Sequence, residues 1–198
     1  MGKIVVTEFV SLDGVMEDPG GSEDFKHGAW TFEIDRGEEG DRFKLDELFE
    51  SEAQLLGRVT YEGFAAAWPK MEDDVGFAER MNSMPKYVFS STLEEADWNN
   101  TTILSGDFAT EVAKLKQDVD GVILVAGSRR LVQGLIEHDL LDELRLMVFP
   151  VSIGAGLRVF PETQKKSPWK RSESLEFSNG VRVDTYLPLV EPELFELT

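Results

Sequence analysis

Two junctions in this chain, at residues 55–64 and 122–131, share one pattern: an apolar run ends at a turn containing glycine, and a helix-period segment follows. Such a pattern predicts a strand that passes directly into a helix. Because the first N–H groups of a helix are free and its dipole is positive there, each junction is suited to bind an anion, above all a phosphate. Arg58 and Arg129 follow the two turns and can add forked hydrogen bonds to phosphate. Two such junctions in one small domain predict a dinucleotide site.

Length and composition narrow the class of protein. The chain has 198 residues, enough for one domain whose core needs no disulfide, and it has no cysteine. We expect a single domain over residues 1–190 and an acidic tail over residues 191–198. His27 and His138 lie far apart with no metal-like spacing, so no metal site is predicted.

The charge balance is strongly acidic. Asp and Glu number 38 against 20 for Lys and Arg, which gives a formal net charge of −18. This excess disfavours nucleic acid and anionic membranes as partners, because both require a basic footprint. A phosphate site must then be a local pocket in which arginine and backbone N–H groups outweigh the background field. The chain shows neither the apolar run of about 20 residues that a membrane helix needs nor a secretory signal pattern, so we expect a cytoplasmic protein.

The rest of the chain continues the alternation of strands and helices. Strands are expected at residues 3–10, 53–56, 86–89, 101–104, 122–125 and 142–151, and helices at 41–51, 58–68, 107–117 and from 129 onward. Residues 18–40 and 70–82 are expected to be irregular and to shape the substrate pocket. Near the end, strands at 174–177 and 181–187 flank Asn179-Gly180, a strong hairpin signal.

These elements predict an α/β fold with a mainly parallel central sheet, helices on both faces and antiparallel strands at the C-terminal edge. Because edge strands tend to pair or to be covered, we also expect a homodimer.

The segments that follow the expected strands are similar to those of a known family. They are Ser11-Leu12-Asp13-Gly14, Leu56-Gly57-Arg58-Val59-Thr60-Tyr61-Glu62, Phe89-Ser90-Ser91 and Val125-Ala126-Gly127-Ser128-Arg129, with residues 140–144 and 150–156 later in the chain. In order and spacing they resemble the dihydrofolate reductase-like fold, and within it the C-terminal reductase domain of bifunctional riboflavin biosynthesis proteins. The resemblance covers about residues 3–187.

The resemblance implies an oxidoreductase that binds NADPH and transfers a hydride to a pterin-like or pyrimidine-like heterocycle. By position it implies cofactor phosphates at Gly57, Arg58 and Thr60, the adenine-ribose end near Ser90 and Ser91, and the pyrophosphate at Gly127, Ser128 and Arg129. Arg58 would favour the 2′-phosphate of NADPH over NADH.

Two carboxylates are candidates for the catalytic proton donor. Asp13 lies in the turn after the first strand, and Asp41 starts the helix before the first junction, roughly where dihydrofolate reductases place their substrate-binding acid. Aromatic walls raise the pKa of a carboxylate toward the working range, which makes Trp30, Tyr61 and Trp68 candidate substrate contacts. The alternatives are a turn residue that binds the backbone for Asp13 and a helix-capping or first-turn acid for Asp41.

A second class of function stays open, a non-catalytic nucleotide-binding or regulatory protein on the same scaffold, because a fold does not fix a function. Each junction taken alone can also be an ordinary strand-to-helix connection that binds no ligand. The deciding observation is spatial. If Gly57 and Gly127 opened onto opposite sides of the molecule, no dinucleotide could span them.

Overall fold

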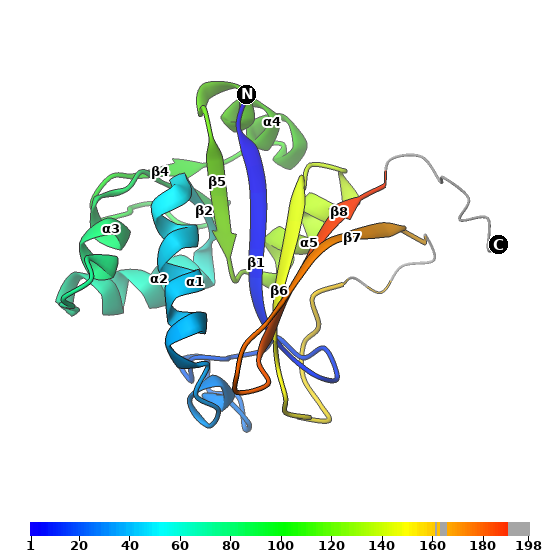
Figure 1. The fold of residues 1–198 in the computed structure, drawn as a ribbon. Helices are drawn as coiled ribbons and strands as arrows, with labels where there is room; N and C mark the ends of the chain where they lie inside the picture. The colour runs from blue at the N-terminus through cyan, green and yellow to red at the C-terminus, as the bar shows by residue number, and fades with distance from the viewer. Residues whose placement is uncertain (161, 163–165, 190–198) are drawn as a thin grey trace.

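The structure is a computed structural model that describes residues 1–160, 162 and 166–189. Its centre is an eight-stranded sheet in the order β4-β3-β2-β5-β1-β6-β8-β7 (Figure 1). The strands are β1 (Lys3–Ser11), β2 (Ser51–Gly57), β3 (Lys86–Phe89), β4 (Thr101–Leu104), β5 (Val122–Ala126), β6 (Glu143–Phe149), β7 (Trp169–Glu176) and β8 (Arg182–Pro188). The α-helices are α1 (Gly37–Glu50), α2 (Arg58–Ala67), α3 (Phe77–Ser83), α4 (Phe108–Asp118) and α5 (Arg129–Glu137), with short 3-10 turns at Trp30–Phe32 and Trp68–Lys70. The tail expected at residues 191–198 lies outside the described residues.

The predicted fold class is confirmed. Strands β1 to β6 pair in parallel, whereas β8 pairs antiparallel with both β6 and β7. The turn between β7 and β8 is the predicted Asn179-Gly180 hairpin, with Gly180 at φ 87°. The homodimer expected from these edge strands stays a prediction.

Alternation along the central strand explains why helices cover both faces of the sheet. Val6 of β1 packs with Leu135 of α5 in one hydrophobic cluster, which also holds the apolar face of α4. Its neighbour Val5 packs with Leu48 of α1 and Tyr61 of α2 in a second cluster, which also receives α3. In Figure 1, α1 and α2 lie in front of the sheet. No helix among the described residues is long and apolar enough to cross a membrane.

Two helices differ from the sequence-based expectation: α1 begins earlier, and α3 was not expected. α1 begins at Gly37 rather than at Asp41, because distant residues fix its first turn: the Glu39 carboxylate accepts a hydrogen bond from the N–H of Ser178 in the hairpin. α3 lies inside the segment expected to be irregular. Its first N–H groups donate to the carboxylate of Asp73, which precedes the helix by several residues, and this spacing is not covered by local capping patterns.

Candidate functional site

The two strand-to-helix junctions meet where the chain order of the sheet reverses. β2 and β5 are neighbours in the sheet. After β2 the chain continues outward to β3 and β4, whereas after β5 it continues in the other direction, past β1, to β6. α2, which follows β2, packs on one face of the sheet, and α5, which follows β5, packs on the other. In open α/β sheets, ligands bind beyond the carboxyl ends of the strands at such a switch point.

A hydrogen-bonded bridge holds the two junctions side by side. The N–H of Gly57 donates to Oγ of Ser128 over 2.8 Å, and the Ser128 hydroxyl donates to Oγ1 of Thr60 over 2.7 Å. The spatial condition set by the sequence is therefore met. We call residues 57–60 and 127–129 the paired corners.

The bridge also leaves the helix N-termini without side-chain caps. Ser128 occupies the N-cap position of α5, but its hydroxyl is turned to the other corner and does not cap the helix. α2 begins after Gly57, which has no side chain to offer. Because neither helix has a side-chain cap, N–H groups at both N-termini remain available to an external anion.

Both corner glycines are required by the close approach of the corners. A Cβ atom on Gly57 would lie 2.8 Å from Oγ and 2.9 Å from Cβ of Ser128. Gly127 has φ 71°, and a Cβ atom there would lie 3.2 Å from Oγ1 of Thr60. Only glycine lets the two backbones come this close without displacing the bridge.

Arg58 is exposed and Arg129 is half-buried, and both already have partners. Nη1 of Arg58 forms an ion pair with Glu62 at 2.8 Å, one turn further along α2. Nε of Arg129 donates to the carbonyl of Arg158 over 3.3 Å. A phosphate at the corners would compete with Glu62 for the Arg58 guanidinium group.

The two serines after β3 have different surroundings. Ser90 is buried, and its hydroxyl accepts hydrogen bonds from the N–H groups of Thr92 and Leu93 at 3.2 and 3.0 Å, so it closes the turn. Ser91 is exposed. Both follow the strand next to β2, on the side away from β5, so they lie at the same edge of the sheet as the paired corners.

Asp13 has the contacts of a structural turn residue. Its carboxylate accepts hydrogen bonds from the Ser11 hydroxyl at 2.6 Å and from the N–H groups of Ile153 and Gly154 at 3.1 and 2.7 Å. The Ser11 hydroxyl, with these backbone donors, lowers the pKa of Asp13 to about 2. A carboxylate that is ionised and links two loops by hydrogen bonds is poorly suited to donate a proton near pH 7.

Asp41 also differs from its expected setting. It lies within α1 rather than at its start, its side chain is 65% exposed, and it pairs with Nε of Arg36 at 2.7 Å. The helix begins four residues earlier than expected, so Asp41 lies beyond the first turn of α1.

The three aromatic residues expected at the substrate have packing contacts in this structure. Trp30 is 2% exposed and packs edge-on against Phe149, and its indole N–H donates to the carbonyl of Glu17. Tyr61 is buried, and its hydroxyl accepts the N–H of Trp98. Trp68 is half-buried and lies just beyond the C-terminal end of α2, at the opposite end from Gly57. A direct contact of these residues with the substrate stays a prediction.

A buried acid that was not singled out from the sequence lies beside the corners. Glu8 of β1 is 5% exposed, and the N–H of Gly127 is close enough to its carboxyl group to lower the pKa of Glu8. Within the described residues its Oε1 has no hydrogen-bond partner. The signal that could have found it is a single charge inside an apolar strand, since ionisable residues are almost never fully buried without a partner.

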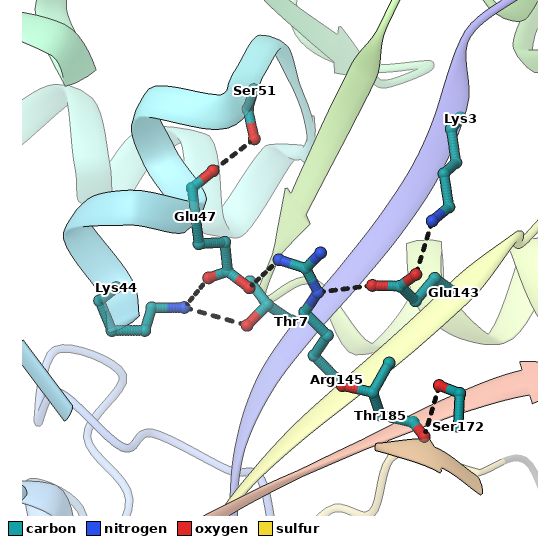
Figure 2. Close-up of polar contacts among 9 residues, drawn as sticks. All are labelled: Lys3, Thr7, Lys44, Glu47, Ser51, Glu143, Arg145, Ser172 and Thr185. Atoms are coloured by element: carbon teal, nitrogen blue, oxygen red, sulfur yellow. Dashed lines mark hydrogen bonds and ion pairs between the residues drawn. The ribbon is translucent and has the colours of Figure 1, made fainter. Parts of the chain in front are cut away.

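A line of alternating charges lies between α1 and the strands β1 and β6. Figure 2 shows Lys44 and Arg145 both directed at the carboxylate of Glu47. Arg145 also contacts Glu143 at 2.6 Å, and Glu143 contacts Lys3 at 2.5 Å. Glu47 is almost fully buried, with a side chain 1% exposed. The line fixes α1, and so the chain that leads into β2, against the central strands.

Known proteins share this architecture. The RibD C-terminal domain family matches residues 2–183. The uncharacterized protein YyaP of Bacillus subtilis (strain 168) is 29% identical over 182 residues, which cover 90% of this chain and 91% of that protein. The structure of a putative riboflavin biosynthesis protein from Shewanella sp. PV-4 matches with a TM-score of 0.75 and 19% identity, covering 94% of this chain and 99% of that one. Dihydrofolate reductase from Enterococcus faecalis, complexed with NADP(H), matches with a TM-score of 0.60 and 14% identity, covering 94% and 96%.

The strand order and the helices on both faces thus define an α/β protein with a dihydrofolate reductase-like fold. Within that class, the chain belongs to the RibD C-terminal domain family.

Proposed function

We propose that this protein is an NADPH-dependent reductase that transfers a hydride to a small pterin-like or pyrimidine-like heterocycle. The observation that carries the proposal is the bridge from Gly57 through Ser128 to Thr60, which places two uncapped helix N-termini side by side. Two phosphate-binding N-termini at one switch point suit a ligand with more than one phosphate group. Membership of a reductase-type family and the likeness to a dihydrofolate reductase complexed with NADP(H) support the same reading.

The residues at the corners fit this cofactor. The absence of a side chain at Gly57 and Gly127 lets the two corners approach closely, which brings the uncapped N-termini of α2 and α5 to one place. Arg58 and Arg129 supply positive charge at the corners. Because the net charge of the protein is −18, the attraction of a cofactor phosphate is confined to this site. The bound cofactor would supply the hydride, while the chain binds and orients it.

The strand order also gives the cofactor a direction. Along the carboxyl edge the strands follow as β3, β2, β5 and β1. With phosphates at the β2 and β5 corners, the adenosine end extends over Ser90 and Ser91 after β3. The reacting end then lies toward β1, the strand that carries Glu8.

The first prediction concerns the bridge itself. In a titration followed by NADPH fluorescence, we expect the native protein to bind NADPH and Gly57→Ala to bind it at least about tenfold more weakly, a loss of about 1.4 kcal/mol. The added methyl group meets Ser128 at 2.8 Å and separates the corners. Gly20→Ala is the matched control, because a Cβ atom there has nothing within 4 Å.

The results of this titration can contradict the proposed function in three ways. A native protein that binds no NADPH would end the reductase proposal. Equal NADPH affinity of Gly57→Ala and the native protein, with equal melting temperatures, would place the nucleotide elsewhere. NADPH binding without oxidation by dihydrofolate or a riboflavin-pathway pyrimidine would favour the non-catalytic alternative or another substrate.

The second prediction concerns the choice between NADPH and NADH. We expect Arg58→Gln to weaken NADPH binding about tenfold and NADH binding less than about twofold, because the guanidinium group would bind the 2′-phosphate that only NADPH carries. Glu62→Gln should tighten NADPH binding, since it releases Arg58 from its ion pair.

Arg42→Gln is the control, because Arg42 forms the same kind of i,i+4 pair with Asp46 on the exposed side of α1. Dissociation constants for both nucleotides measure the effect. An equal loss for NADPH and NADH in Arg58→Gln would show that Arg58 does not read the 2′-phosphate.

A further inference from the structure

Glu8 has no part in the proposed binding of phosphates at the paired corners. β1 is the neighbour of β5 on the side away from β2, and Thr7, the residue before Glu8, pairs with Ala126 at the end of β5. In this register Glu8 stands beside Gly127, at the corner that follows β5. Its carboxyl group is buried, and the Gly127 N–H is close enough to lower its pKa.

Burial keeps this acid neutral at physiological pH. Removal from water is the main cause that raises the pKa of Glu8 to about 8. Lys44 and the Gly127 N–H lower the pKa, the Glu47 carboxylate raises it, and the value of about 8 includes all of these effects. A neutral carboxyl group carries one O–H donor. Because Oε1 has no hydrogen-bond partner within the described residues, the group has unused hydrogen-bonding capacity beside the site.

We propose that Glu8 is the acid–base group of the reductase site, facing the reacting ring of the dinucleotide and supplying the proton that accompanies hydride transfer. This role rests on the proposed function. The O–H bond of Glu8 breaks and an N–H bond forms on the carbon–nitrogen double bond of the heterocycle, whose carbon accepts the hydride from the reduced nicotinamide. The Glu8 carboxylate then regains a proton from water, and the nicotinamide is left oxidised.

The two redox forms of the nicotinamide give a test that needs no substrate. The ring of NADP⁺ is positively charged, whereas that of NADPH is neutral. A cation against Glu8 favours the carboxylate, so binding of NADP⁺ must release the proton of Glu8. Binding of NADPH leaves that proton in place.

Proton release is measured by titration calorimetry at pH 7.5 in two buffers that differ in ionisation enthalpy. For the native protein we expect release of about 0.5 proton or more per NADP⁺ bound, and less than about 0.1 per NADPH. Glu8→Gln should bind NADPH with affinity within about threefold of the native protein and release no proton with NADP⁺. Asp41→Asn, at the competing acid, should leave the release unchanged.

The outcomes separate this inference from the proposed function. Failure of both nucleotides to bind overturns the proposed function and the role of Glu8 with it. Binding of both with equal proton release in the native protein overturns the role of Glu8 alone, and this comparison needs no variant. Proton release that survives in Glu8→Gln, or disappears in Asp41→Asn, assigns the acid to another residue.

Discussion

Replacing Glu47 by Gln is expected to lower the free energy of unfolding by about 3 to 5 kcal/mol. The carboxylate of Glu47 is buried between Lys44 and Arg145, which lie on different elements. Removing the charge leaves two largely buried cations short of a partner, and an uncompensated buried charge is far more costly than a missing exposed pair. Urea unfolding at pH 7 measures the loss.

The neighbouring residue provides a control on the same helix. Asp46 forms an exposed pair with Arg42, with side chains 50% and 72% exposed, so Asp46→Asn should cost less than about 0.5 kcal/mol. The double variant Glu47→Gln with Lys44→Met should recover part of the loss, because one uncompensated cation is removed. A free energy of unfolding within 1 kcal/mol of the native value in Glu47→Gln would show that the other partners, Thr7 for Lys44 and Glu143 for Arg145, already stabilise the two cations.

The paired corners show which features of the site the sequence could predict and which it could not. Strand-to-helix junctions are local patterns, so Gly57 and Gly127 could be identified from their own neighbours. The bridge through Ser128 could not, because it depends on β2 and β5 being adjacent in the sheet. Local capping rules alone would have the Ser128 hydroxyl cap its own helix.

The surroundings of the candidate acids and aromatic residues could not be predicted, for a related reason. Asp41 was expected at a helix start, but the hairpin residue Ser178 contacts the first turn of α1 from 139 residues away. Trp30 was expected as an aromatic wall beside a catalytic carboxylate, whereas its indole ring is buried against residues of β6. Residue type and local spacing do not determine which surface covers a side chain.

The last prediction concerns the pH dependence of stability, for which Glu8 should be the dominant single residue. Burial raises the pKa of Glu8 from 4.5 to about 8 in the folded protein. Between these values the folded state keeps a proton that the unfolded chain has lost. The stability that Glu8 contributes is therefore complete below about pH 4.5 and is lost as the pH rises through 8.

At 1.36 kcal/mol per pKa unit, the shift corresponds to about 5 kcal/mol between pH 4.5 and pH 9. Glutamine has nearly the same shape and never ionises, so Glu8→Gln should gain about this much stability relative to the native protein over that range. Urea unfolding across this range measures the difference, and comparison with the native chain cancels the titration of all other carboxylates. Glu95→Gln, at an exposed position, should run parallel to the native protein. If the difference between Glu8→Gln and the native protein stayed constant within 1 kcal/mol, Glu8 would not be held neutral by burial, and the proton that the site requires would have to come from another group.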